Sequence, residues 1–430
     1  MLLDRRRFSG LLAGLAGLVG GAALPRTSLH AASPADPCRL PASINALTSM
    51  TAGITPIGDD ERTARIERAR ALMAEARIDA LVLEPGATME YFTGVQWGLS
   101  ERPFVVVIPL RGEPGWVCPG FEEARGREQI RVAADVRVWQ EDESPAALIA
   151  GILRDRGAAA GRIGVEERVR YFVADATRRA AAAAEFVSGT PVTAGCRMIK
   201  SATELALMQR ASDITIAAFR ATFVTMKAGT LNTELAENMT AAMRRLGGED
   251  PWSLTLFGAA SAIPHGTIEP QRLKEGDIVL MDSGCAVMGY QSDVTRTTVF
   301  GKPSARQTEI WNLERRAQDA AFAAVRVGAS CESVDAAARE VITAAGFGPG
   351  YRLPGLPHRT GHGIGMEGHE WTNFVRGNTT PIRPGMCFSD EPTIAIPGEF
   401  GVRLEDCLYI TESGPKFFTP RSEAIDRPVP

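Results

Sequence analysis

The pattern of apolar residues changes near residue 252, and this change constrains the fold of the chain most strongly. Before it, short apolar runs alternate with stretches of helical spacing, at 62–76, 80–84, 104–110, 145–158 and 173–185. That alternation predicts an α/β domain over residues 59–195. After it, strands are expected at 277–282, 289–300, 386–394 and 401–410, beside helices at 304–327 and 331–346. This second pattern predicts an α+β domain over residues 196–430.

Two long helices are expected where the domains join. One follows Met198 and runs to about Met226, and Ser201 or Thr203 is placed to cap it near Glu204. The other covers about 232–246, and two glycines end it. Two domains are also what the length predicts, because about 400 residues exceed what one hydrophobic core normally organises.

The first 33 residues have the plan of an export signal. Arg5-Arg6-Arg7-Phe8 precedes an uncharged apolar run, Leu11 to Leu24, and the arginine pair resembles a twin-arginine signal. The alternative is a membrane anchor, but this run is shorter than the roughly 20 residues that span a bilayer. We therefore expect residues 1–33 to be a signal peptide, 34–58 an extended arm, and the protein to be exported to the periplasm.

The net charge limits the classes of binding partner, and the cysteine spacing indicates whether disulfides form. The net charge of −4 becomes more negative without the arginine-rich leader, so neither nucleic acid nor a membrane span is expected of the mature chain. The seven cysteines include no Cys-x-x-Cys pair and are expected to be free buried thiols. A pairing of Cys38 with a later cysteine stays open in an oxidising compartment.

Asp282 and Asp293 are the first residues that suggest a metal site. Asp282 ends an apolar strand, and Asp293 follows in Ser292-Asp293-Val294-Thr295. A turn from Gly284 to Gly289 would return the chain and place both carboxylates side by side. Either aspartate alone is typical of a turn, so the pair gains weight only from the residues downstream.

Histidines are concentrated in one later segment. His358, His362 and His369 lie within 12 residues among several glycines, in a chain with five histidines. Histidine is the commonest metal ligand and an acid or base at neutral pH, so this density favours a site over core packing. His265 precedes them, whereas His30 lies in the leader. Glu367 and Glu370 are expected to be solvated or to lie behind the ligands.

Two more carboxylates end apolar strands. Glu391 follows Met386-Cys387-Phe388, where a buried charge needs a partner. In the strand around Glu405, a period of two puts Arg403 and Glu405 on one face and Asp406 on the other. We expect Arg403 to hold Glu405 ionised and Asp406 to be a surface or supporting group.

This ligand set suits two metal ions better than one. Four carboxylates and one imidazole are too many for a single ion, and carboxylates can bridge two. Such a pair lowers the pKa of a water between the ions and stabilises a hydrolytic transition state. No cysteine occupies a ligand position, which argues against a structural zinc site.

At these residues the chain resembles the pita-bread metallopeptidases, the family of methionine aminopeptidase, aminopeptidase P and prolidase, with metal-free creatinase as a relative. The resemblance covers nearly all of the mature chain and implies a pita-bread domain after a smaller creatinase-like α/β domain. The family's ligands correspond in order to Asp282, Asp293, His362, Glu391 and Glu405. The resemblance also implies a homodimer.

The resemblance further implies roles around the metals. His265 would contact substrate near its amino terminus or leaving group, His369 would hydrogen-bond the scissile carbonyl, and His358 would wall the proline pocket. Glu391 would also carry a proton from water to the leaving nitrogen. Arg403 and Thr295 would support the ligands.

The expected activity is hydrolysis of Xaa-Pro bonds in peptides with proline at the second position, by attack of a hydroxide bridging two divalent ions. Manganese is the first expectation, and cobalt, zinc and iron are alternatives. Dipeptidase and aminopeptidase activity are not distinguished; Trp97 and Arg102 could form a lid or an ordinary loop.

Two other classes of function are alternatives to a peptidase. One branch of the fold is a lyase of dimethylsulfoniopropionate with an extra aspartate two residues after the first ligand, where this chain has Gly284. A non-catalytic binding module is disfavoured because it has no need of a complete metal set.

Overall fold

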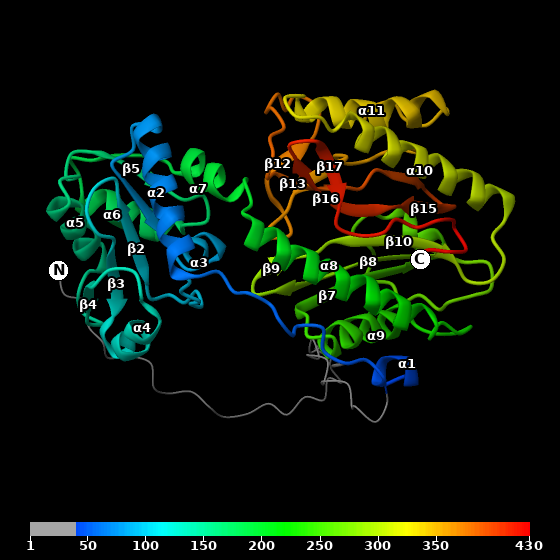
Figure 1. The fold of residues 1–430 in the computed structure, drawn as a ribbon, viewed down its shortest axis with the longest axis horizontal. Helices are drawn as coiled ribbons and strands as arrows, with labels where there is room; N and C mark the ends of the chain where they lie inside the picture. Colours follow the sequence, from blue (N-terminus) through cyan, green and yellow to red (C-terminus); the bar gives the residue numbers. More distant parts are fainter. Residues whose placement is uncertain (1–39) are drawn as a thin grey trace, which may run out of the picture.

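The computed structural model describes residues 40–430, which form two domains joined by one helical segment (Figure 1). The predicted signal peptide, residues 1–33, and Cys38 lie outside the described residues. Residues 40–58, expected as an extended arm, contain helix α1, Ala42–Asn45, which packs against α8 and α9 of the second domain. Ser43 Oγ donates a hydrogen bond to the carbonyl oxygen of Ala221 at 2.8 Å.

The first domain is a mixed sheet covered by helices, as the alternating pattern predicts. Its strands lie in the order β4-β3-β2-β1-β5-β6; β2 is antiparallel to β1 and β3, and the other neighbours are parallel. The strands are β1 Ala80–Leu83, β2 Val105–Pro109, β3 Gly115–Pro119, β4 Asp135–Trp139, β5 Arg162–Val165 and β6 Glu185–Ser188. The α-helices are α2 Asp59–Ala76, α3 Ala87–Thr93, α4 Glu123–Gln129, α5 Pro145–Asp155, α6 Tyr171–Ala180 and α7 Thr190–Arg197.

One helix of this domain is shorter than predicted. The alanine-rich stretch 173–185 was expected to be helical throughout, but α6 ends at Ala180. Glu185 instead begins β6, which pairs in parallel with β5 at the edge of the sheet. Strand pairing therefore overrides helix propensity at this end of the stretch.

The second domain encloses a long antiparallel sheet between two pairs of helices. Its order is β12-β11-β13-β16-β10-β8-β7. In addition, β17 pairs with β16 and β9 with β8, and β14 and β15 form a separate ribbon. The strands are β7 Glu249–Phe257, β8 Ile278–Val287, β9 Tyr290–Gln291, β10 Val294–Val299, β11 Gly361–Gly363, β12 Glu370–Phe374, β13 Cys387–Asp390, β14 Thr393–Ile396, β15 Phe400–Arg403, β16 Glu405–Thr411 and β17 Gly414–Phe417. The helices are α8 Ala202–Phe223, α9 Asn232–Arg245, α10 Ala305–Ala324 and α11 Cys331–Ala344.

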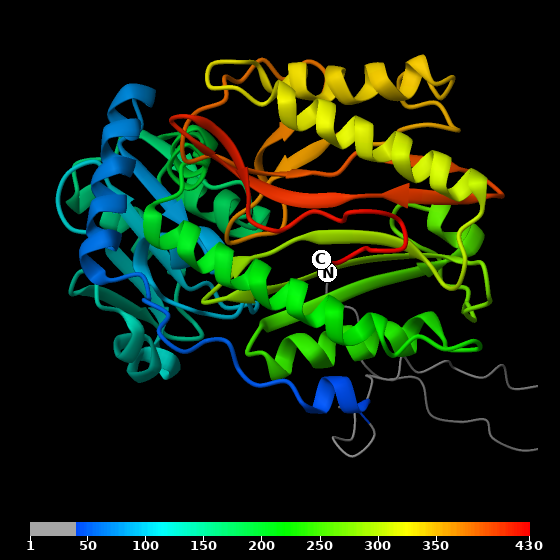
Figure 2. The same ribbon diagram turned by 45° about the vertical axis from the view of Figure 1, so that its right-hand side comes forward.

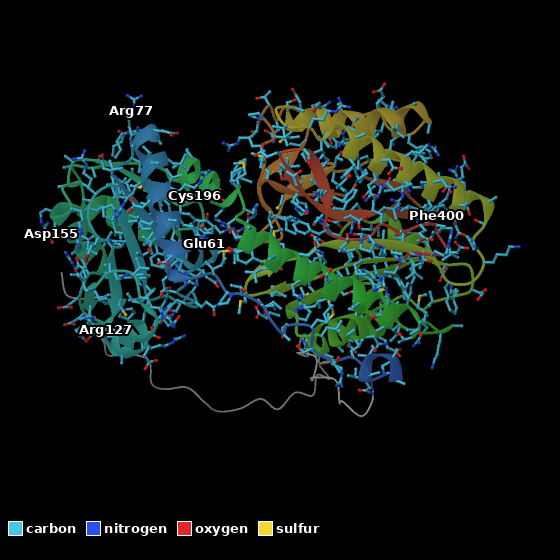
Figure 3. The ribbon with its side chains drawn as sticks, in the orientation of Figure 1. Glu61, Arg77, Arg127, Asp155, Cys196 and Phe400 are labelled. Atoms are coloured by element: carbon cyan, nitrogen blue, oxygen red, sulfur yellow. The ribbon has the colours of Figure 1, made fainter. Side chains whose placement is uncertain are left out.

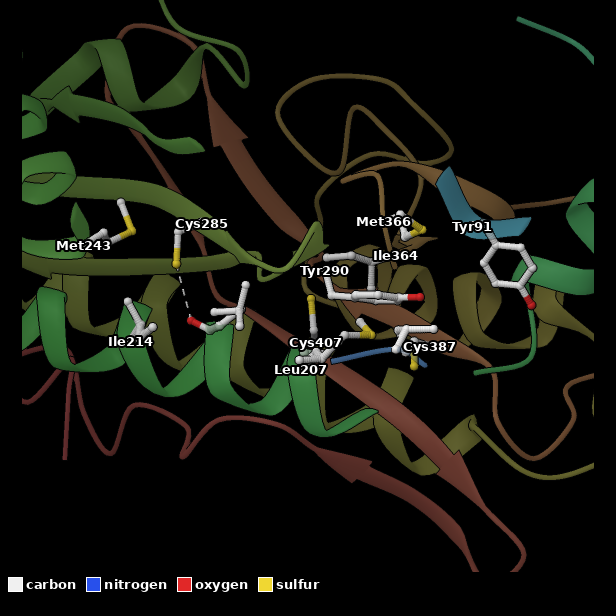
Figure 4. Close-up of a cluster of buried hydrophobic side chains, with 14 of the residues drawn as sticks. Tyr91, Leu207, Ile214, Met243, Cys285, Tyr290, Ile364, Met366, Cys387 and Cys407 are labelled. Atoms are coloured by element: carbon white, nitrogen blue, oxygen red, sulfur yellow. Dashed lines mark hydrogen bonds between the residues drawn. The ribbon is translucent and has the colours of Figure 1, made fainter. Parts of the chain in front are cut away.

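Figure 2 shows α8 and α9 on one outer side of the strands and α10 and α11 on the other. Each pair covers its own apolar core. Figure 4 shows part of the core beside α8, where Ile214, Met243 and Cys285 lie close together and Tyr290 lies nearer the first domain. Among the described residues the cysteines are buried and none pairs with another, in agreement with the expected free thiols.

Helix α8 begins with the predicted cap. Ser201 Oγ accepts from the backbone N–H of Glu204, and the Glu204 carboxylate accepts from the backbone N–H of Ser201. This capping box fixes where the second domain starts. Of the helices in residues 40–430, none is long and apolar enough to cross a membrane.

Candidate metal centre

Neighbouring strands of the second sheet carry the predicted ligands. The strands β11, β13, β16, β10 and β8 lie side by side, and each places one ligand at the same region of the sheet. In that order the ligands are His362 in β11, Glu391 after β13, Glu405 at the start of β16, Asp293 before β10 and Asp282 in β8. The sheet order therefore brings together side chains that are far apart in the sequence.

The hairpin that holds the two aspartates differs from the predicted one. A turn was expected from Gly284 to Gly289, but β8 continues to Val287, and Met288 and Gly289 alone make the turn with positive φ angles of 49° and 80°. Gly284 has another role, because a Cβ atom there would meet the carbonyl oxygen of Ser292 at 2.1 Å. The glycine lets the two strands approach closely behind the aspartates.

Thr295 links two ligands on the strands beside it. It is paired in register with Asp282 of β8 and with Glu405 of β16. Its hydroxyl donates to Glu405 Oε2 at 2.7 Å and accepts from Arg403 Nε at 3.0 Å. Thr295 thus orients Glu405 and fixes the guanidinium, which is the supporting position expected for it.

Arg403 has a different main partner from the expected one. Its Nη2 donates to Asp282 Oδ2 at 2.5 Å, whereas its Nε lies 4.0 Å from Glu405 Oε2. Leu404 separates β15 from β16, so Arg403 and Glu405 do not share one continuous strand. The arginine therefore chiefly orients Asp282, and it reaches Glu405 through Thr295.

His362 faces two carboxylates. Its Nε2 lies 3.1 Å from Glu391 Oε1 and 3.8 Å from Asp293 Oδ2, while its Nδ1 lies 3.1 Å from the carbonyl oxygen of Gly363. Ser389, which the sequence interpretation did not single out, donates to Glu391 Oε1 at 3.2 Å and accepts from the backbone N–H of His362 at 2.9 Å. Its place two residues before Glu391 on a strand is the signal that could have identified it.

The ligand cluster fits divalent cations. One ligand atom each of Asp293, His362 and Glu405 lies within 4.8 Å of the others. Within the described residues, Asp282 Oδ1, Asp293 Oδ1 and Glu405 Oε1 are buried without a hydrogen-bond partner. Buried oxygen atoms of this kind need a cation or a donor. The donor set of carboxylate oxygens and one imidazole suits such ions as Mn, Co, Fe or Zn.

The electrostatics of the cluster also indicate missing positive charge. Burial and the nearby charges of Asp282 and Glu391 raise the pKa of Asp293 well above its usual value. Burial and the neighbouring acids likewise raise the pKa of Glu405 well above its usual value. Burial alone would raise the pKa of Glu391 too, but the nearby His362 outweighs it and the pKa is lowered.

The other predicted histidines lie around one cavity of about 990 Å³ that is lined by the ligands. The His369 ring stands edge-on to that of His362, with 4.2 Å between centroids, and burial beside His362 lowers its pKa to about 4. His358 Nε2 lies 3.0 Å from Thr393 Oγ1, and burial lowers its pKa. His265 is exposed at the cavity wall. The remaining lining residues are Arg168, Trp252, Leu254, Gln291, Arg359, Met366, Glu367 and Gly368, with Arg403.

Two carboxylates, each expected either near solvent or in a supporting position behind the ligands, are buried. Asp406 does lie on the face opposite the metal ligands, but its side chain is 1% exposed and accepts from Arg296 Nη2 at 2.6 Å. Glu370 is 4% exposed and pairs with Arg197 and Lys200. Both have cationic partners distant in sequence, which local patterns do not reveal. Trp97 stacks on Phe104 inside the first domain, and Arg102 pairs with Glu141; neither lines this cavity.

Family models match both domains. Residues 206–412 match the model of metallopeptidase family M24, and residues 65–199 match the Creatinase/Prolidase N-terminal domain. The predicted fold class, an α/β creatinase-like domain followed by an α+β pita-bread domain, is thereby confirmed. The predicted prolidase and aminopeptidase P branch is confirmed with it.

Individual relatives span most of the chain. An uncharacterized peptidase of Schizosaccharomyces pombe is 35% identical, with 87% of this chain and 85% of the relative covered. An Xaa-Pro dipeptidase of Lactobacillus helveticus is 31% identical over 82% of this chain and 96% of the relative. The crystal structure of dipeptidase PepE from Mycobacterium ulcerans superimposes with a TM-score of 0.80 at 30% identity, covering 86% of this chain and 99% of that one.

Proposed function

The chain belongs to metallopeptidase family M24, and from that premise we propose that it is a dinuclear Xaa-Pro dipeptidase that releases proline from dipeptides. Its membership makes it a metal-dependent peptidase. Family membership alone does not give a preference for proline or for dipeptides. We base that part of the proposal on relatives named Xaa-Pro dipeptidase. The alternative of a dimethylsulfoniopropionate lyase has no support among these relatives, and Gly284 leaves no space for the extra aspartate.

One observation carries this proposal. Asp282, Asp293, His362, Glu391 and Glu405 converge on one cavity, and three of the carboxylates keep a buried oxygen atom without a partner in the described chain. These residues would hold two divalent ions, with manganese as the first expectation. When bound, such ions supply Lewis acidity that activates water and polarises a carbonyl group.

The protein's own side chains supply the remaining chemistry. Glu391 accepts a hydrogen bond from Ser389 and faces His362; in this proposal it would accept a proton from water and pass it to the leaving nitrogen. His369 is neutral at physiological pH because its pKa is lowered, so it can donate one hydrogen bond to the scissile carbonyl. His265 and His358 line the same cavity and would contact the substrate on either side.

A reconstitution assay tests the proposal. The protein is stripped with a chelator, loaded with Mn, Co or Zn, and given Ala-Pro, Ala-Pro-Ala and Ala-Ala, with release of product measured by chromatography. We expect metal-dependent release of proline from Ala-Pro and much slower cleavage of the others. Glu391→Ala serves as the inactive control. Cleavage of Ala-Pro-Ala at an equal rate would contradict the dipeptidase assignment, and undiminished activity of the control would contradict the site.

Two further expectations belong to this proposal. Export by the twin-arginine route to the periplasm is checked by cell fractionation of the full chain, with and without Arg5 and Arg6 replaced by Lys. A homodimer is checked by light scattering on the purified protein. Neither result affects the assignment of the ligands.

A further inference from the structure

The segment that carries His369 has little regular structure of its own. It connects β11 to β12 through residues 364–369. Its backbone hydrogen bonds outside the sheet lie at its start: Ile364 donates to Cys387 at 3.3 Å, Gly365 donates to Glu367 at 3.1 Å, and the Gly365 carbonyl oxygen accepts from the backbone N–H of Gln291 at 2.8 Å. These bonds hold Ile364 and Gly365, but they do not by themselves fix the direction of the His369 side chain at the other end of the loop.

The carboxylate of Glu370 holds the backbone of the 364–369 loop through hydrogen bonds. Glu370 Oε1 accepts from the backbone N–H of Met366 at 2.8 Å and from that of Glu367 at 3.2 Å. One oxygen atom thus folds the loop back onto the residue that follows His369. Two backbone donors are satisfied by a side chain where no strand partner reaches them.

Two cations from the junction between the domains hold this carboxylate. Arg197 Nη2 donates to Glu370 Oε1 at 2.5 Å, and Lys200 Nζ donates to Glu370 Oε2 at 2.9 Å. Burial would raise the pKa of Glu370, but Lys200 and Arg197 outweigh it and lower the pKa to about 2. The carboxylate is therefore ionised at physiological pH and cannot rotate without breaking four hydrogen bonds.

The same arginine ties the loop to the first domain. Arg197 Nη1 donates to Thr88 Oγ1 at 2.9 Å, and Thr88 Oγ1 donates to Glu166 Oε1 at 2.9 Å. The loop that carries His369 is thus attached to both domains through one buried carboxylate. Figure 3 shows Cys196, the residue before Arg197, on the side of the first domain that faces the second.

We propose that Glu370 is a positioning residue for the reaction, which fixes the 364–369 loop so that the His369 ring stays edge-on to His362 and faces the cavity. Glu370 does not touch the cavity's reacting centre and acts through His369. This inference rests on the proposed function only for its kinetic consequence. The placement of the ring is a property of the protein alone.

The first experiment observes the histidine ring directly. The full chain has five histidines, so the Cε1–Hε1 signals of histidine-labelled protein, loaded with zinc, are assigned by single substitutions. We expect Glu370→Gln to shift or broaden the His369 signal and to leave those of His265 and His358 in place. Glu84→Gln is the matched control, since Glu84 is a buried carboxylate paired with Arg170 in the first domain and, within the described chain, makes no hydrogen bond with the 364–369 loop. An unchanged His369 signal in E370Q would overturn the proposal.

The second experiment measures the kinetic coupling. A misplacement of about 1 Å costs up to about 100-fold in rate, so E370Q is expected to lower kcat by about 10- to 100-fold with KM changed less than about threefold. In a His369→Ala background the same substitution should add less than about twofold. An equal loss in both backgrounds would show that Glu370 acts elsewhere and would contradict the proposal.

A third variant covers the case in which E370Q does not fold. Glu370→Asp keeps the charge but is shorter, so it can reach its cations or the loop N–H groups less well. It is expected to give an intermediate kcat and a smaller change in the His369 signal; wild-type values for both would overturn the proposal. If the wild-type protein cleaves no Xaa-Pro peptide, the proposed function fails, whereas the spectroscopic arm still tests the positioning.

Discussion

Two groups of buried carboxylates in the second domain differ in how their charge is balanced. The ligand group, with Asp293 and Glu405, keeps oxygen atoms that no residue of the described chain satisfies, and the pKa of both residues is raised. Glu370 is as deeply buried, yet four donors surround it and its pKa is lowered. The unmatched oxygen atoms of the first group line the cavity and fit an external cation, whereas the charge of Glu370 is balanced by cations of the protein itself.

The largest loss of activity is expected when one carboxylate of the ligand group is removed. Glu405→Gln is expected to lower metal-dependent activity by more than the 10- to 100-fold that loss of a supporting residue costs, because a ligand itself is lost. Activity at saturating metal and the bound metal per protein, measured by emission spectroscopy, check this result. Full metal content with normal activity would show that Glu405 is not a ligand.

Substitution of Glu370 should lower the stability of the folded protein. Glu370→Gln leaves Lys200 without its anion and Arg197 with Glu367 alone, and breaking a buried pair in this way costs about 3–5 kcal/mol. The free energy of unfolding of E370Q should therefore fall by that amount, as measured by denaturant titration. The pair between Arg168, whose side chain is 60% exposed, and Glu367 provides the comparison, and Arg168→Gln should change stability by less than about 1 kcal/mol.

In the metal-free protein, removing a carboxylate from the ligand group should raise stability, whereas removing Glu370 lowers it. A carboxyl whose pKa is raised on folding contributes stability at low pH and loses it as the pH rises through the raised value. Wild-type protein without metal should thus lose stability above the ordinary carboxyl pKa of about 4, whereas E405Q should lose less. At pH 8 we expect E405Q to melt about 2–4 °C higher. A lower melting temperature would mean that this cluster needs no external cation.

The contribution of Glu370 to stability should depend on pH in the opposite direction from that of the ligand group, and this is the smallest of the expected effects. Its lowered pKa contributes stability above its ordinary value, about 4.3, and this is lost as the pH falls toward 2. The difference in melting temperature between wild type and E370Q should accordingly shrink between pH 5 and pH 3. A constant difference over that range would indicate that the Glu370 charge is not what stabilises the protein.

The sequence allowed prediction of features that depend on neighbouring residues. Glu391 directly follows β13 and Glu405 begins β16, so their places follow from the strand pattern, and Ser201 follows from capping. Asp282 was expected to end a strand but lies within β8. Partners across the sheet could not be predicted in the same way. Arg403 was assigned to Glu405, two residues away, but binds Asp282, 121 residues away. Glu370 could not be separated from a solvated residue, because its cations, Arg197 and Lys200, precede it by 173 and 170 residues.

The turn after Asp282 shows a second limit. Gly284 was interpreted as the start of a turn, since glycine is common in turns. Its actual requirement is space for the backbone of Ser292 on the neighbouring strand. A pattern along one strand does not show which backbone approaches it from the side.

The segment that joins the domains is fastened on both sides. Ser201 Oγ donates to Glu61 Oε1 of the first domain at 2.7 Å, and Tyr290 links Glu204 at 2.9 Å to Arg65 at 3.0 Å. These hydrogen bonds connect the two domains at the segment about which they would have to rotate. The relative orientation of the two domains is therefore set by side-chain hydrogen bonds at this segment, and any change of that orientation would have to break them.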